Sequence, residues 1–346
     1  MRKSRREATM LAACFFTCTA FTCVLAGVAH AAEFAPSAEL LAAAKREGKV
    51  VLYTANFLDT EQTVSKRFFE RFGVQIEIVR APTGALITRI KTEAAANRII
   101  ADVIDISDRV QARAMIELFA PYAPPNAADY PAITRTGDRL WPRSGNAWTI
   151  TYNSALVTDP PKSWADLTKP EFGKQRLGQT VVAAGGGPFN RAMFERKVLG
   201  EDYWVRQAAL KPTLYPSQAQ MVDAMIRGDI AIAPLVTNLA IPLAAQGAPL
   251  RWFFAPEGVP VTVFCAGLAK GAAHPNAARL FLDWALSTEG QALMVELGSF
   301  SALARAPMPQ GVDAAAIKTW YPDDDEIAKI FASWTDDWNK AYGYRQ

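Results

Sequence analysis

The segment 228–240, "GDIAIAPLVTNLA", contains a short apolar run that breaks at a proline and leads directly to Thr237 and Asn238. An apolar run of this length followed at once by a helix start predicts a strand-to-helix unit. The segment 76–90, "IEIVRAPTGALITRI", has the same order, with Thr83 and Gly84 at its helix start. We expect both helix starts to face one ligand.

Helices and buried strands alternate along the first half of the chain. Strands are predicted at 49–55, 74–79 and 101–107, and helices at 36–45, 59–72, 83–97 and 108–118. This spacing predicts a largely parallel sheet with helices on both of its faces. After a proline-rich loop at 120–131, the segment 146–153, "NAWTITYN", alternates as an antiparallel or crossover strand does.

The α/β order returns in the second half. A strand is predicted at 180–183, and helices at 189–198, 202–210 and 218–226. The segment 259–269, "VPVTVFCAGLA", would carry the chain back across the molecule to a helix at 275–286. Thr288, with Gln291 at capping-box spacing, predicts the next helix start, and the acidic run 323–326 predicts the start of the last helix.

The N-terminus carries the features of an export signal. Arg2, Lys3, Arg5 and Arg6 precede an apolar stretch at 10–28, and Ala29-His30-Ala31 has the small-x-small form of a cleavage site. We therefore expect cleavage near Ala31 and a periplasmic product. No cysteine follows the small residues, which argues against a lipid anchor; an uncleaved membrane anchor is the alternative.

Removing this segment changes the composition. It accounts for four of the 37 Lys and Arg residues and one of the 34 Asp and Glu residues, so the remainder is neutral overall. The basic isoelectric point therefore predicts no nucleic-acid partner. Cys265 is then the only cysteine and His274 the only histidine, which excludes an internal disulfide. The remaining length favours two domains.

The order and spacing of several segments resemble those of periplasmic solute-binding proteins of ATP-driven importers, in the group with ferric-ion, polyamine, phosphonate and sugar-phosphate binders. These segments include "VVLYTA", "RAPTGALITRIKTEAAA", "SWADLTKPEFGK", "VDAMIRGDIAIAP" and "HPNAARLFLDWALSTEGQALM". The resemblance implies an α/β fold of the two-lobed type 2 periplasmic-binding class, a ligand cleft between the lobes, and delivery to a membrane permease with its ATPase. The predicted limits are 1–31 for the signal, 32–142 and 262–300 for lobe 1, and 143–261 and 301–346 for lobe 2.

The predicted ligand site follows from the strand-to-helix junctions. In open α/β sheets the ligand lies beyond the carboxyl ends of the strands, where helix N-termini present free N–H groups that favour an anion. Each of these residues is also a good helix cap, which is the alternative explanation for its presence. The junction residues that we predict to bind ligand are Thr54, Asn56, Thr83, Gly84, Ser107, Arg109, Gly187, Ser217, Thr237 and Asn238.

Arginine and aromatic side chains are further candidates. Arg109, Arg143 or Arg191 could clamp an acidic group, or could pair with structural carboxylates instead. The aromatic residues predicted to wall the cleft, or else to belong to the core, are Trp148, Tyr152 and Phe189, with Phe57 sharing the ambiguity.

A ferric-ion-binding protein of the same fold is one alternative. The resemblance implies two adjacent tyrosines after the strand "DIAIAP", but the chain has Leu235-Val236-Thr237-Asn238 there. Tyr152, Tyr203 and Tyr215 remain available. His274 precedes a proline at a predicted helix start and is interpreted as a surface cap, so no metal site is predicted.

An exported hydrolase or lyase that uses Asp and Glu in acid-base chemistry is the alternative from another class. The sequence has no nucleotide-binding, G-x-S-x-G or H-E-x-x-H motif, and Cys265 lies in an apolar strand where a buried thiol is expected. We therefore expect no enzyme activity and no cofactor. The prediction is a monomeric binding protein whose lobes close on a small polar solute, with an anion such as a phosphonate, phosphate ester or carboxylate as first choice.

Overall fold

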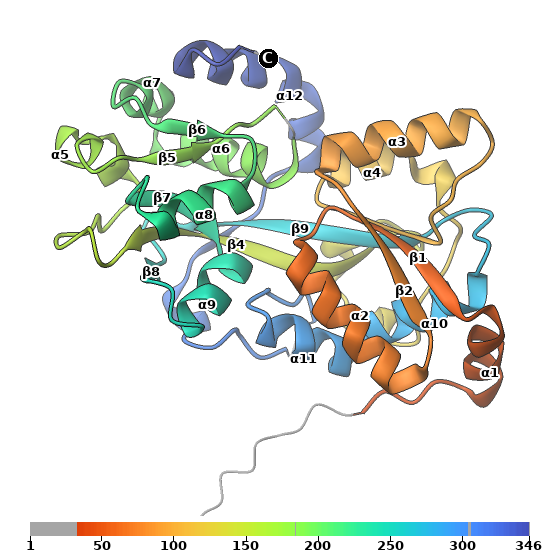
Figure 1. Ribbon diagram of the computed structural model, residues 1–346. Helices are drawn as coiled ribbons and strands as arrows, with labels where there is room; N and C mark the ends of the chain where they lie inside the picture. The colour runs from red at the N-terminus through yellow and green to blue at the C-terminus, as the bar shows by residue number, and fades with distance from the viewer. Residues whose placement is uncertain (1–32, 184, 304–305, 346) are drawn as a thin grey trace, which may run out of the picture. The chain divides into compact units, whose positions relative to one another are not determined.

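The computed structural model describes residues 33–183, 185–303 and 306–345, and the predicted export signal lies outside them. Helices and strands alternate along the chain, as Figure 1 shows. The helices are α1 (Ala38–Glu47), α2 (Leu58–Phe72), α3 (Thr83–Ala95), α4 (Arg109–Ala114), α5 (Pro170–Gly173), α6 (Gly186–Leu199), α7 (Tyr203–Ala208), α8 (Gln218–Arg227), α9 (Thr237–Ala245), α10 (Pro275–Ala285), α11 (Thr288–Glu296) and α12 (Asp324–Tyr342). The strands are β1 (Lys49–Thr54), β2 (Gln75–Arg80), β3 (Val103–Ile106), β4 (Trp141–Asn153), β5 (Gly178–Thr180), β6 (Thr213–Tyr215), β7 (Ile232–Val236), β8 (Leu250–Phe253), β9 (Val259–Leu268) and β10 (Thr319–Trp320).

The main sheet has the strand order β2-β1-β3-β9-β4-β7, with β8 paired to β4 and β10 paired to β9. Strands β1, β2 and β3 are parallel, as predicted. The prediction of a largely parallel sheet is wrong for the centre, because β9 runs antiparallel to β3 and β4, and β4 runs antiparallel to β7 and β8. Strands β5 and β6 form a separate parallel pair.

The two long strands β4 and β9 connect two groups of elements (Figure 1). The first half of β4 pairs with β9, and its second half pairs with β7 and β8. At its other end β9 pairs with β3. The crossover character predicted for 146–153 and 259–269 is therefore confirmed, since both segments belong to these strands.

Helix α2 illustrates how local sequence sets the packing on the β1 side. Val64, Phe68 and Phe72 recur at helical spacing, and all three are buried in one core cluster with α10. The rings of Phe68 and Phe281 meet edge to face with centroids 5.5 Å apart. Gly73 ends the helix in the left-handed conformation at φ 71°, and its N–H donates to the carbonyl of Phe69, as the sequence predicts.

Several predicted boundaries were wrong. The strand expected at 180–183 is β5, which ends at Thr180, because the chain then turns toward the glycines of α6. The helix expected at 108–118 is α4 followed by a short 3₁₀ turn. The cap of α11 is Ser287, whose hydroxyl accepts from the N–H of Gly290. Gln291 instead donates to the carbonyls of residues 143 and 285, so no capping box forms.

Strand β6 was not predicted, because three residues are too few to show a period. The limits of the two lobes stay predictions. Among the described residues, no helix combines the length and the apolarity that a bilayer-spanning segment requires.

Candidate ligand-binding cleft

A central cavity of about 90 Å³ lies where the predicted junctions converge. Each of the five predicted strand-to-helix junctions contributes a wall residue, either a predicted residue or its neighbour, and so does the helix start at Ser217. The β1, β2 and β3 ends provide Ala55, Phe57, Arg80, Pro82, Thr83 and Ser107, the opposite side provides Gly185, Gly187, Pro188, Pro216, Ser217, Gln218 and Val236, and β4 and β9 provide Asn146, Thr262 and Phe264.

The two sides approach closely at the start of α6. The hydroxyls of Thr83 and Ser107 share a hydrogen bond of 2.8 Å. Gly186 has φ 59°, and a Cβ atom placed there would lie 2.4 Å from the Ser107 hydroxyl oxygen. Only glycine fits this left-handed position at such a short distance. The "GGG" motif therefore lets the first turn of α6 reach the junctions on the other side of the cavity.

Several helix N-termini lie at the wall of the central cavity. Thr83 begins α3, Gly187 lies in the first turn of α6, and Ser217 caps α8 by accepting from the N–H of Gln220. Val236 immediately precedes α9. The N-terminal N–H groups of helices carry partial positive charge and attract anions.

Arg80 is the only charged residue among the described residues that line the central cavity. It ends β2, and its Nε donates to the carbonyl of Asn56 at 3.2 Å. Burial lowers the pKa of Arg80 from its usual value, yet a guanidinium remains charged in proteins. No carboxylate is within ion-pair distance of Arg80 in the described part of the chain.

Arg80 was not among the arginines predicted from the sequence, which follow a strand end (Arg109) or lie near a predicted crossover or helix start (Arg143 and Arg191). Arg80 is the last residue of a strand and precedes "APTG". The rule that ligands lie beyond the carboxyl ends of strands would have found it.

Thr54 and Asn56 lie beneath the cavity wall and are fully buried. The Thr54 hydroxyl lies 3.4 Å from a Glu61 carboxylate oxygen and 3.3 Å from an Asp105 oxygen. The Asn56 amide donates to Glu61 at 2.9 Å. These two predicted site residues therefore support the junction from below, and neither lines the central cavity.

Arg143 joins the same buried network. It donates to both oxygens of Glu61, at 2.8 and 2.7 Å, and forms an ion pair with Asp105. Burial raises the pKa of Asp105 to about 6. Burial acts to lower the pKa of Arg143, but Glu61 and Asp105 together raise it. Arg143 therefore pairs with structural carboxylates, which is the alternative considered from the sequence. Arg191 does the same, because it is fully buried in an ion pair with Glu195.

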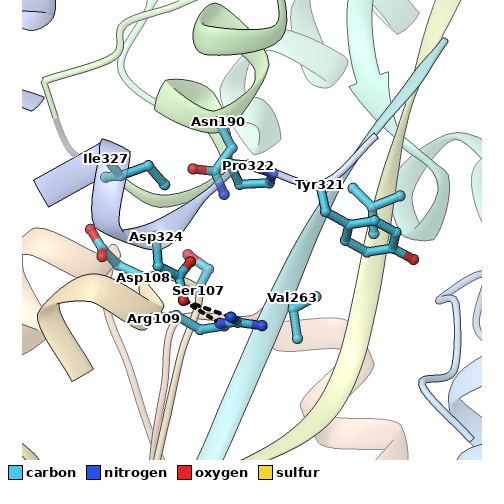
Figure 2. Close-up of a pocket in the computed structure, with 10 residues that line it drawn as sticks. Ser107, Asp108, Arg109, Asn190, Val263, Tyr321, Pro322, Asp324 and Ile327 are labelled. Atoms are coloured by element: carbon cyan, nitrogen blue, oxygen red, sulfur yellow. Dashed lines mark hydrogen bonds and ion pairs between the residues drawn. The ribbon is translucent and has the colours of Figure 1, made fainter. Parts of the chain in front are cut away.

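Arg109 lies in a separate small cavity of about 30 Å³, shown in Figure 2. Its Nε and a terminal nitrogen contact the Asp324 carboxylate at 2.8 and 2.6 Å, which joins α4 to the start of α12. Ser107 lines both this cavity and the central one. A role for Arg109 in clamping a ligand stays a prediction, and in this structure its guanidinium is paired with Asp324.

One backbone N–H group at the start of α6 is already hydrogen-bonded to the Asp108 carboxylate. Backbone N–H groups of Gln111 and Gly186 donate to its carboxylate. Burial raises the pKa of Asp108, while these hydrogen bonds lower it. Gly187, the next residue of α6, lines the central cavity.

The remaining predicted residues surround the cleft without lining the central cavity. Trp148 is fully buried, with the Arg191 guanidinium 5.2 Å from its ring centroid. Phe189 is 2% exposed and packs on Phe331, with ring centroids 4.7 Å apart. Tyr152 is half-buried near the end of β4, and Gly84 is half-buried in the first turn of α3.

Thr237 and Asn238 are buried at the start of α9. The Asn238 amide donates to the Asn56 side-chain oxygen at 3.3 Å, which links α9 to the junction after β1. The Thr237 hydroxyl and the Asn238 side-chain oxygen have no hydrogen-bond partner in the described part of the chain.

The features weighed for an enzyme have structural roles here. Cys265 is fully buried, and burial raises the pKa of its thiol to about 12, which removes its nucleophilic form at neutral pH. His274 precedes α10, and its Nδ1 lies 2.8 Å from the buried Asp102 carboxylate. Cys265 is buried, as expected from the sequence. His274 is the N-cap residue of α10, as predicted, but its side chain makes no cap hydrogen bond there. In the described residues no group of three or more His, Cys, Asp or Glu side chains is arranged to hold a metal ion.

The family model of bacterial extracellular solute-binding proteins matches residues 54–292 of this chain. This match covers more than half of the sequence, and the chain belongs to that family. A relative from Haemophilus influenzae of uncharacterized function is 25% identical over 280 residues, which span 74% of this chain and 78% of the relative.

Solved structures with a similar fold are two-lobed binding proteins. AfuA from Actinobacillus pleuropneumoniae, solved with fructose-6-phosphate, has a TM-score of 0.75 and 20% identity over 86% of this chain and all of its own. Iron-bound HitA from Pseudomonas aeruginosa has a TM-score of 0.69 and 21% identity over 84% of this chain and 99% of its own. A periplasmic thiamin-binding protein has a TM-score of 0.70 and 19% identity over 85% of this chain and 96% of its own.

This likeness confirms the predicted two-lobed α/β fold. Because the similar proteins carry iron, a sugar phosphate or thiamin, the fold does not identify the solute. The chain is a solute-binding protein of the importer type, and the family consists of binding proteins rather than enzymes.

Proposed function

We propose that this protein captures a small organic or inorganic anion in the periplasm and delivers it to a membrane permease driven by an ATPase. The observation that carries the proposal is Arg80, which is the only charged group among the described residues lining a cavity that several helix N-termini face. A guanidinium offers paired N–H donors that match carboxylate and phosphate oxygens.

The proposed mechanism is closure of two lobes on the ligand. Thr83 and Ser107 contribute from one side, and Gly187 and Ser217 contribute from the other. An anion that contacts both sides stabilises the closed form, because only that form completes the set of donors. The closed form is then the one presented to the permease, and the binding protein acts as a monomer without a cofactor.

Ferric iron is the second candidate, and it is favoured only by structural similarity to iron-binding proteins. Fe(III) prefers anionic oxygen ligands such as phenolate and carboxylate. The described wall of the central cavity holds an arginine and includes no tyrosine, aspartate or glutamate. Tyr203, one of the available tyrosines, is buried and donates to the Trp164 carbonyl instead.

The test is native mass spectrometry of protein purified from a periplasmic extract, followed by a thermal-shift panel. The panel contains phosphonates, sugar phosphates, carboxylates, polyamines and Fe(III). An anion present at a hundred times its Kd should raise the free energy of unfolding by about 2.7 kcal/mol. Stabilisation by polyamines or Fe(III) alone would reject the proposal, and turnover of a stabilising compound would favour the enzyme alternative.

A further inference from the structure

A second, larger cavity of about 430 Å³ adjoins the central one. It lies between the N-terminal end of α2 on one side and helices α8 and α9 on the other (Figure 1). Phe57 and Arg80 line both cavities. We call this space the outer cavity. A ligand group that contacts the Arg80 guanidinium is therefore at the border between the two spaces.

The walls of the outer cavity carry a group of large apolar side chains beside its polar ones. Leucine, valine and phenylalanine side chains come from α2, α8, α9 and the end of α11. The principal ones are Phe57, Leu58, Val222, Leu239, Leu243 and Leu297. An apolar surface of this kind gains by excluding water, so it favours an uncharged body on the ligand.

Two carboxylates limit the charge of that body. Asp59 lies on α2 and Asp223 lies on α8, and both line the outer cavity from opposite sides. Both residues are exposed, and neither forms an ion pair in the described part of the chain. Because like charges repel, these carboxylates disfavour a second acidic group at the far end of the ligand.

Asn238 is a separate indication that the outer cavity receives a ligand. It lines the cavity and is only 4% exposed. Its side-chain oxygen has no hydrogen-bond partner in the described part of the chain. Since buried polar atoms are normally hydrogen-bonded, a donor on the ligand or a bound water would complete this site.

From these features we infer that the solute is an organic anion with a single acidic head group, held by Arg80, and an apolar body of several carbon atoms that fills the outer cavity. The inference rests on the proposed function and narrows it to one chemical class. Small inorganic anions would use only the central part of the cleft, and dianions with an acid at each end would be excluded.

The experiment measures affinities by isothermal titration calorimetry for two matched series of anions. One series is acetate, hexanoate and adipate, and the other is methylphosphonate and hexylphosphonate. Each buried methylene strengthens binding by roughly fourfold at full burial. Because the outer cavity is partly open, we expect at least a tenfold gain in affinity for hexanoate over acetate and for hexylphosphonate over methylphosphonate. Adipate should bind more weakly than hexanoate.

A matched pair of variants tests whether the gain in affinity of the longer compounds comes from the outer cavity. Ala219 lines the outer cavity, and Ala219→Trp should abolish the advantage of the hexyl compounds while leaving the binding of methylphosphonate and acetate unchanged. Ala245 is exposed at the end of α9 and is absent from the cavity wall, so Ala245→Trp should keep the advantage.

The outcomes separate this inference from the proposed function. If methylphosphonate or acetate binds and weakens in Arg80→Gln, the anion function stands. Equal affinity for short and long members would then overturn the inference alone, as would a gain that persists in Ala219→Trp. If no member of either series binds, the inference fails, and the thermal-shift panel with sugar phosphates and the other anions then decides the anion function.

Discussion

Neutralising Arg80 is the most direct test of how the cleft holds a ligand. Arg80→Gln removes the only charge found on the described wall of the central cavity, and glutamine can still donate to the Asn56 carbonyl that Arg80 contacts at 3.2 Å. At a separation near 4 Å, and with an effective dielectric constant of about 20, a guanidinium and an anion attract by about 4 kcal/mol. Solvent around the half-buried side chain reduces this value. We expect a loss of about 2 to 4 kcal/mol, which is roughly a 30-fold to 1000-fold rise in Kd.

The assay is calorimetric titration with whichever anion gives the largest thermal shift. Arg80→Lys keeps the charge without the planar fork and should bind between the wild type and Arg80→Gln. Arg227→Gln is the matched control, because Arg227 is exposed at the end of α8 and pairs with Asp229. If Arg80→Gln binds within twofold of the wild type while its melting temperature is unchanged, Arg80 does not hold the ligand and the electrostatic argument is refuted.

Three further predictions concern stability. Arg143→Met should lower the free energy of unfolding by about 3 to 5 kcal/mol, because Glu61 is then left buried without its cation; a loss below about 1 kcal/mol in urea denaturation would contradict this. Burial raises the pKa of Asp283 from 3.8 to about 6, so the folded state binds its proton more strongly, and the free energy of unfolding should fall by up to about 3 kcal/mol as the pH rises from about 4 to about 6. Asp283→Asn should remove that part of the slope in denaturation curves at several pH values, and an unchanged slope would contradict the assignment. Gly267→Ala should destabilise the protein by about 1 to 3 kcal/mol, because the added Cβ would lie 2.4 Å from the Arg139 carbonyl oxygen; an unchanged melting temperature would show that the backbone can move there.

The helices and strands that were predicted well are long enough to show a hydrophobic period. The stripe of α2 and its terminal glycine gave both its buried face and its end within one residue. The antiparallel centre of the sheet was missed because strand direction is set by distant pairing, whereas the other failures are local. Strand β6 is too short to show a period, and the hydroxyl of Ser287 rather than Thr288 caps α11. Neighbouring residues of the same type compete for the cap position, and backbone geometry decides between them.

The site was predicted in outline but not in detail. Five strand-to-helix junctions and the helix start at Ser217 were predicted from the sequence, and each contributes a residue or its neighbour to the wall of one central cavity. Side chains that line the cavity, such as Ser107 and Ser217, have the same sequence pattern as those beneath its wall, such as Thr54. Arg80, which lines the cleft, was missed, and Arg143, a predicted candidate, is buried in an ion pair.

The sequence by itself determined the class of fold, because hydrophobic periodicity and helix caps are local properties that a chain carries wherever it folds. It also predicts a ligand site built from helix starts with hydroxyl and glycine residues. The partner of each arginine depends on which strands lie side by side, and in this sheet residues as far apart in sequence as Glu61 and Arg143 meet. Such contacts arise only when the whole chain has folded, and for that reason the tertiary structure alone showed which charge is available to a ligand.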